Sequence, residues 1–88
     1  MAKVRVVEFE GKVQGHAIFC PGCRCGHLFD HRWHFNGNLE MPTFQGSMLV
    51  NQDDPQSRCH SFVKDGMIQF LDDCFHALKG QTVPLEDF

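Results

Sequence analysis

The sequence predicts a small, mainly β domain, built as an antiparallel sheet or a partly open barrel, with one cysteine-rich turn and one short C-terminal helix. Three observations indicate this class. Short strand-like runs alternate with turn residues along the whole chain. The pairs Asn36-Gly37 and Asp65-Gly66 are typical of hairpin turns. The segment Cys20-Pro21-Gly22-Cys23 has the spacing of a zinc-binding turn.

The first half of the chain is expected to hold three strands. Residues 3–9 alternate polar and apolar side chains and predict a half-buried strand that ends near Gly11, followed by a short link. Residues 16–19 lead into the cysteine turn as a second strand. Residues 27–35 form a third strand-like run, which the Asn36-Gly37 pair should end in a tight hairpin turn.

The second half is expected to contain three more strands and the helix. Pro42 excludes a central strand at that point. Asp72 or Asp73 would cap the helix, and Gly80 would end it. The expected elements are a strand at residues 48–50, a polar loop at 51–58, strands at 59–63 and 67–71 joined by a turn at 64–66, the helix at 74–79, and an extended tail at 81–88.

Length and cysteine content indicate how such a chain is stabilised. Its 88 residues predict a single domain spanning residues 1–88. A chain of this length buries only about 60% of its unfolded surface, so a metal or disulfide staple is common. Five cysteines are an odd number, which argues against a complete disulfide framework. With no visible signal peptide and no apolar run of the ~20 residues that a membrane span needs, we expect a cytoplasmic protein with reduced thiols.

The charge pattern bears on the class of partner. The formal net charge is −3, and the lysines and arginines are scattered rather than gathered in a basic stripe. This distribution argues against nucleic-acid binding through bulk electrostatics. We therefore expect a protein substrate or partner, while the oligomeric state stays open.

Cys20 and Cys23 are the strongest candidate metal ligands. Pro21 and Gly22 between them suit a tight turn that brings two thiolates to one tetrahedral ion. The sequence leaves the other ligands open among six residues: Cys25, His27, Cys59, His60, Cys74 and His76.

Two of the six candidates fit best. His27 begins a strand that can fold back onto the turn, whereas Cys25 is awkwardly close to Cys23. Cys59 lies far along the chain, and a distant ligand would staple two halves of the sheet. The predicted site is a structural Zn²⁺ held by Cys20, Cys23, His27 and Cys59, with buried free thiols as the alternative.

A serine and a histidine suggest a second kind of chemistry. Ser47 follows Gly46, which permits a sharp bend that would present the hydroxyl. His60 follows the expected ligand Cys59 and would be held rigidly as a general base, with Asp72 or Asp73 to orient it. The competing interpretation is a loop serine and a hydrogen-bonded histidine, because both residue types are common.

Several longer motifs carry a resemblance to known proteins. They are Phe19–Cys23 with His27, Trp33–Gly37, Pro42–Ser47, Cys59–Leu71, and His76–Leu78 with Gly80–Val83. Together they resemble a family of small phage and prophage proteins with a domain of uncharacterised function, often mislabelled "ammonia monooxygenase". The resemblance covers about residues 18–86. The domain is also similar to the proposed peptidase encoded in some bacterial ubiquitin-like conjugation operons.

The resemblance implies a zinc-stabilised serine hydrolase of the bacterial host cytoplasm, acting on a protein or a ubiquitin-like conjugate. It carries metal positions to Cys20, Cys23, His27 and Cys59, the nucleophile to Ser47 and the base to His60. The predicted catalytic set is completed by Asp73, which lies in a C-terminal segment that the operon-encoded relatives lack. Cys25 and Cys74 stand outside the family's pattern.

Two other functions remain open from the sequence. A non-catalytic structural-zinc module that mediates protein–protein interaction would need no contact between Ser47 and His60. A catalytic zinc site would need an open coordination position near a carboxylate or histidine.

Overall fold

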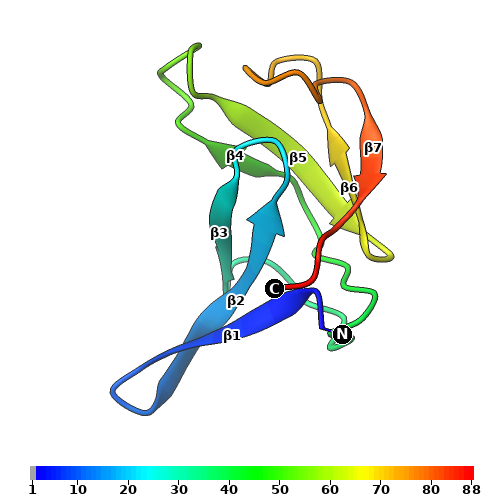
Figure 1. Cartoon of the computed structure of the whole chain (residues 1–88). Coiled ribbons are helices and arrows are strands. Elements are labelled where there is room, and N and C mark those ends of the chain that lie inside the picture. The colour runs from blue at the N-terminus through cyan, green and yellow to red at the C-terminus, as the bar shows by residue number, and fades with distance from the viewer. Residues whose placement is uncertain (1) are drawn as a thin grey trace.

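The computed structural model describes residues 2–88 and contains seven β-strands (Figure 1). They are β1 (Val4–Phe9), β2 (Lys12–Cys20), β3 (Cys25–Asp30), β4 (Met48–Val50), β5 (Cys59–Lys64), β6 (Met67–Phe70) and β7 (Thr82–Pro84). They form two antiparallel sheets, with strand orders β1-β2-β3 and β4-β5-β6-β7. The mainly β class is therefore confirmed. Within residues 2–88 the structure has no helix, and so none that could cross a membrane.

The first sheet is a meander of two hairpins. Glu10 and Gly11 join β1 to β2 with φ angles of 51° and 77°, the geometry of a type I′ turn. The residues expected to link these strands belong to β2, which starts at Lys12. β2 and β3 pair as far as Cys20 opposite Cys25. The cysteine turn is therefore the tip of the second hairpin.

The second sheet carries the two later sequence motifs. Asp65 and Gly66 have φ angles of 52° and 78°, which confirms the turn between β5 and β6. Along β5, buried residues alternate with more exposed ones from Cys59 onward, so His60 lies on the outer face. Leu49 of β4 stands opposite His60. The segment before β4 therefore approaches the same face as the histidine.

The C-terminal tail packs on the domain as an extended segment. β7 pairs with β6, and Leu85 just after it is buried. The backbone N–H of Phe88 donates to the carbonyl of Ala2 at 2.9 Å. The chain consequently ends beside its own first strand (Figure 1).

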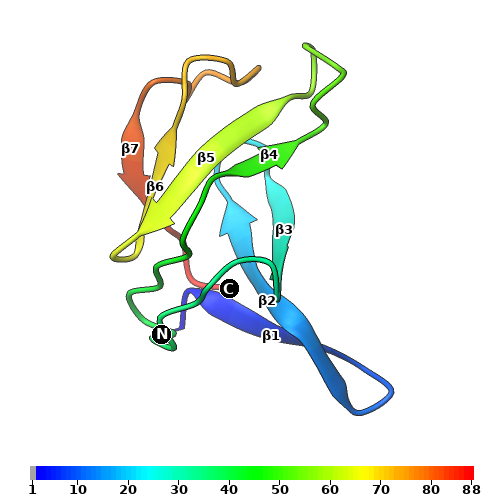
Figure 2. The same cartoon turned by 180° about the vertical axis from the view of Figure 1, so that it is seen from behind.

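One apolar core is shared by the two sheets. Ile18 and Phe29 from the first sheet and Ile68 and Phe70 from the second are almost fully buried within it. Phe44, in the long connection between β3 and β4, stacks on Phe29 with ring centroids 4.1 Å apart. Figure 2 shows this connection passing close to the chain just before β1, where Lys3 N–H donates to the Leu39 carbonyl, and then reaching β4. The connection therefore packs an aromatic ring against the core between the two sheets.

The helix expected at residues 74–79 is wrong. The structure has turns there, with backbone N–H groups of Cys74 and Lys79 donating to the carbonyls of Leu71 and His76, three residues back. Six residues form at most one costly helical nucleus. The side chains of Cys74 and His76 are instead held by contacts with the start of β5, and these fix the local conformation.

The tight hairpin expected at Asn36-Gly37 is also wrong. β3 ends at Asp30, and an isolated antiparallel bridge joins Phe35 to Phe44 around a wider loop. The Asn36 side chain accepts from the backbone N–H of Asn38 and donates to the carbonyl of Met41. These local bonds give the chain an alternative to the two-residue turn.

Candidate functional site

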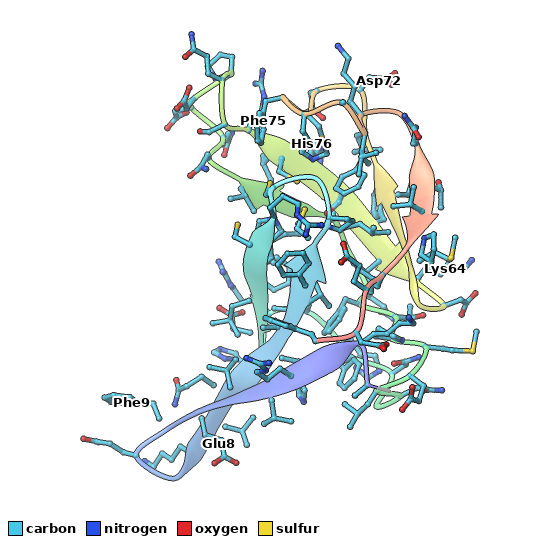
Figure 3. All side chains as sticks on the ribbon, in the orientation of Figure 1. Glu8, Phe9, Lys64, Asp72, Phe75 and His76 are labelled. Carbon is cyan, nitrogen blue, oxygen red and sulfur yellow. The ribbon has the colours of Figure 1, made fainter. Side chains whose placement is uncertain are left out.

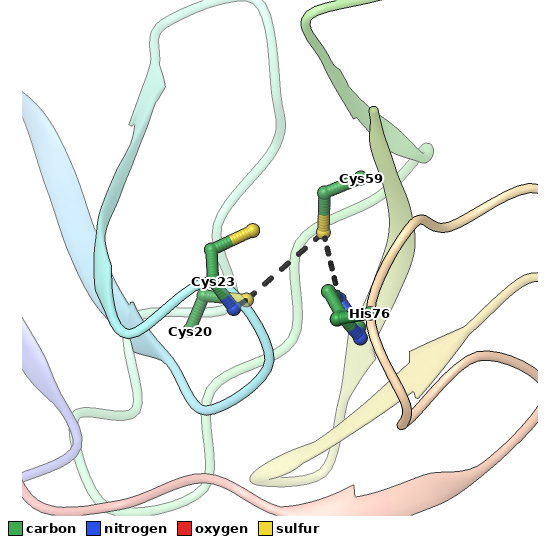
Figure 4. Close-up of side chains that lie close together, drawn as sticks. All are labelled: Cys20, Cys23, Cys59 and His76. Carbon is green, nitrogen blue, oxygen red and sulfur yellow. Dashed lines mark hydrogen bonds between the residues drawn. The ribbon is translucent and has the colours of Figure 1, made fainter. Parts of the chain in front are cut away.

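Four potential ligands from distant parts of the chain meet between the two sheets. Cys20, Cys23, Cys59 and His76 each offer one atom, and these four atoms lie within 4.8 Å of one another (Figure 4). Cys20 Sγ is 4.0 Å from Cys59 Sγ, which is 3.6 Å from His76 Nε2. Three sulfur atoms and one imidazole nitrogen form a donor set suited to a tetrahedral thiophilic ion. This group could therefore hold a metal ion.

The hairpin tip presents its two thiols through a tightly bonded turn. Arg24 has φ of 59° and donates its backbone N–H to the carbonyl of Cys20 at 2.8 Å. The N–H of Cys23 donates to Cys20 Sγ at 3.3 Å. A hydrogen bond of this kind stabilises a thiolate, so the turn favours the ionised form of Cys20.

Gly22 has a packing role that its place between the cysteines does not reveal. A Cβ built on Gly22 would overlap the imidazole ring of His76. Glycine at this position therefore lets the His76 ring lie against the turn. Phe70 and Phe75 contact the same ring edge-on, with centroids 4.4 Å and 5.2 Å away. Figure 3 shows Phe75 and His76 together at one end of the second sheet.

The three thiols do not ionise alike. A hydrogen bond from Cys59 lowers the pKa of Cys20 to about 3, against the opposing effect of burial. The same interaction raises the pKa of Cys59, and burial raises that of Cys23 to about 12. These opposed shifts arise because ionisation of one thiol in the buried cluster makes further negative charge there costly. A divalent cation would remove that cost and displace the protons.

His27, predicted as the nitrogen ligand, lies beside this group but outside it. The four-atom group contains His76 instead. His27 is buried next to Cys20, whose pKa it helps to lower, and its Nε2 has no hydrogen-bond partner among the described residues. His76 was one of the alternatives that the sequence left open. The chain after β6 folds back and brings His76 to the cysteines. Ligand spacing in the sequence does not predict this path.

The predicted base and its orienting acid also meet. His60 Nδ1 is 3.2 Å from Asp73 Oδ2, an ion pair when the imidazole is protonated. Asp73 is therefore the neighbour of His60, rather than Asp72. This contact leaves the Nε2 side of the ring for another partner.

Ser47 stands on the same face as His60 without bonding to it. Because Met48 pairs with Ser61 and Leu49 with His60, extending the ladder by one residue sets Ser47 diagonally across from His60. Diagonal neighbours have backbone positions about 7–8 Å apart, within reach of long side chains only. Among residues 2–88 no hydrogen bond joins the Ser47 hydroxyl to His60. The Ser47 carbonyl accepts from Trp33 Nε1 at 3.1 Å, which anchors the segment.

A groove of about 670 Å³ lies on the outer face of the second sheet. Its lining includes Gln45, two residues before Ser47, and Phe62, two residues after His60. Phe62 is 39% exposed, and the hydrogen bond from Phe44 N–H to the Val63 carbonyl fixes the groove wall against β5. The groove therefore lies within two residues along the chain of both Ser47 and His60, neither of which lines it.

Comparison with known families identifies the group to which the chain belongs. The model of the BubE family, described as "Bacterial ubiquitination-like system serine protease", matches residues 2–71. The chain belongs to the BubE family. The match includes Ser47 and His60 and ends before Asp73, Cys74 and His76. The search of curated proteins and the search of solved structures each found no match to the chain.

Replacing Gly22 by alanine tests the packing of the turn against His76. Because the new Cβ would overlap the imidazole, we expect Gly22→Ala to weaken Co²⁺ binding about tenfold or more, although all four ligands remain. Titration with Co²⁺, followed by thiolate–metal charge-transfer absorption, measures the change. Gly26→Ala is the matched control, since a Cβ there meets nothing closer than 3.4 Å. Equal affinities in the two variants would contradict the packing argument.

The two histidines near the thiols are distinguished by single substitutions. His76→Ala removes a member of the four-atom group, so we expect metal affinity to fall more than about 100-fold. His27→Ala removes a neighbour of Cys20, and a loss of about tenfold is expected. Competition with a chromogenic chelator gives both affinities. The reverse order would restore His27 as the ligand.

Proposed function

We propose that this protein is a zinc-stabilised serine hydrolase that cleaves an acyl bond in a protein or ubiquitin-like conjugate. The observation that carries the proposal is the His60–Asp73 pair at 3.2 Å on the face that Ser47 shares. A serine is a weak nucleophile until a positioned base takes its proton, and that base needs an orienting partner. Membership of the BubE family supports the same reaction class.

In the proposed reaction, His60 Nε2 takes the proton from Ser47 Oγ as that oxygen attacks the substrate carbonyl. Asp73 accepts from His60 Nδ1–H and so keeps Nε2 free to act as the base. The imidazolium then gives its proton to the leaving amine or alcohol, and water releases the acyl group from Ser47 by the reverse proton path. Because Ser47 lies diagonally from His60 in the free protein, substrate binding is the step that brings them into hydrogen-bond reach.

The oxyanion is expected to meet backbone N–H groups of residues 46–48. β4 is an edge strand that pairs only with β5, so backbone groups on its other edge are open. Gly46 has φ of 94°, which bends the chain just before Ser47. The Trp33 bond to the Ser47 carbonyl supports a fixed position for this bend. The arrangement supports an anion-binding backbone at the nucleophile.

The proposed Zn²⁺ would be held by Cys20, Cys23, Cys59 and His76. Four protein ligands leave no open position, so the ion would supply folding free energy and charge neutralisation rather than a reacting water. His60 follows Cys59 directly, and Asp73 lies three residues before His76. The ion therefore supports the positions of both members of the histidine–carboxylate pair.

A protein is the substrate class that the surface supports. The groove includes Gln45 and Phe62 and is lined partly by side chains of β5 and β6, so an extended polypeptide could lie along these strands. The five free cysteines support a cytoplasmic setting, in keeping with the bacterial, phage or prophage origin that the sequence resemblance implies.

Labelling of Ser47 by a fluorophosphonate tests the nucleophile. We expect covalent modification at Ser47 in the zinc-loaded protein and none in Ser47→Ala. His60→Ala should abolish labelling, and Asp73→Asn should slow it about 10²–10⁴-fold, because it loses the acceptor that holds the imidazole in place. Mass spectrometry of the intact protein and its peptides gives the rate and the site. An unlabelled wild-type protein would favour the non-catalytic zinc module.

Removal of the metal tests its structural role. If the ion joins the two sheets, a strong chelator should lower the thermal midpoint and broaden or abolish cooperative unfolding. Calorimetry with and without chelator measures the effect, and adding Zn²⁺ back should restore it. A metal-free protein that unfolds at the same temperature would show that the core is sufficient without the ion.

A further inference from the structure

Cys74 makes two contacts that neither the metal site nor the family match accounts for. Its Sγ accepts from the backbone N–H of His60 at 3.2 Å and donates to the backbone carbonyl of His60 at 3.1 Å. The side chain is buried, only 5% exposed, yet it lies outside the group of four potential ligands. One thiol thus holds both polar backbone groups of the proposed base.

The strand geometry explains why His60 needs such a partner. Pairing of β5 with β6 begins at Ser61 opposite Phe70, so His60 lies one residue beyond the end of that ladder. Its N–H and carbonyl point toward the side where β6 would continue, since Leu71 N–H also reaches the His60 carbonyl at 2.9 Å. There the Cys74 side chain makes hydrogen bonds that a neighbouring strand would otherwise make. Without that partner the partly buried His60 N–H would lose its hydrogen bond at a cost in desolvation.

We propose that Cys74 is a positioning residue for the acyl-transfer reaction, holding the His60 backbone so that the imidazole meets Asp73 and faces Ser47. This inference rests on the proposed function. Asp73 and Cys74 are consecutive, and they act on the two parts of one residue: the carboxylate on the ring and the thiol on the backbone. Because both lie beyond residue 71, the segment after the family match supplies the partner of the His60 ring and the partner of its backbone N–H.

The four-atom group flanks the contact between Cys74 and His60 and would hold both segments in place. Cys59 immediately precedes His60, and His76 follows Cys74 by two residues, so each of the two contacting segments has one end in the group. The hydrogen bonds between Cys74 and His60 lie between Cys59 and His76. A shift of Cys74 would therefore move the His60 backbone while leaving the ligands in place, and displacement of a catalytic group by about 1 Å costs about 100-fold in rate.

Amide hydrogen exchange tests the contact without reference to activity. In the zinc-loaded protein, Cys74→Ala should raise the exchange rate of the His60 amide about tenfold. Cys74→Ser retains a group that donates and accepts, so it should restore part of the protection. The control is Cys25→Ala, which removes an exposed thiol outside the group of four and should change nothing at His60. Unchanged exchange in Cys74→Ala would overturn the inference.

Fluorophosphonate labelling then tests the catalytic consequence. We expect the maximal rate of Ser47 labelling to fall about 100-fold in Cys74→Ala and to recover only in part in Cys74→Ser, with the probe's half-saturating concentration and the zinc content unchanged. If Cys74→Ala does not fold, the comparison of Cys74→Ser with Cys25→Ala decides: a slower rate with faster His60 exchange supports the inference. Wild-type labelling with no effect of either Cys74 variant overturns it. No labelling of the wild type instead overturns the hydrolase itself.

Discussion

The meeting of the cysteine turn with Cys59 and His76 is the contact on which the rest of the structure depends. It joins the tip of the first sheet to the start of β5 and to the turns after β6. A chain of 88 residues has little core to hold two small sheets in register. Cys20 and Cys59 are buried there with opposed pKa shifts, so a bound cation would relieve the cost of ionising both thiols. The contact between the two sheets and the ionisation of the thiols therefore depend on the same four residues.

This coupling explains the arrangement of the candidate active site. His60 is adjacent to one member of the metal group, and Asp73 lies three residues from another. His60 is the second residue of β5, whereas Asp73 lies in the turns after β6. The pair is held where the start of this strand meets those turns, and such a contact lets a very small protein position a histidine and a carboxylate without a large scaffold.

The sequence predicts the parts of this molecule that depend on local chemistry. The Asp65-Gly66 turn follows from two residues that tolerate positive φ, and the strand at residues 59–63 from its alternating pattern. The spacing of Cys20 and Cys23 predicts a turn that brings two thiols together, and both sulfur atoms belong to the four-atom group. The errors arise where tertiary contacts override a local signal. Residues 74–79 have a helix-like pattern, but their side chains bond to β5, and Asn36 uses its amide to widen a loop.

The choice between His27 and His76 shows why spacing cannot complete such a site. Both histidines are buried near the thiols, and one of them lies within the four-atom group while the other leaves Nε2 without a partner. His27 is fixed by the hairpin that carries Cys20, so it belongs to the same rigid unit as two ligands. His76 comes from the opposite sheet. If the group binds an ion, His76 would give it a second ligand from the side of the second sheet, whereas Cys59 alone would leave the ion attached mainly to the first sheet. An ion that joins two sheets would join them more firmly with two ligands from each side than with three and one. This consideration favours His76 over His27, in agreement with the distances.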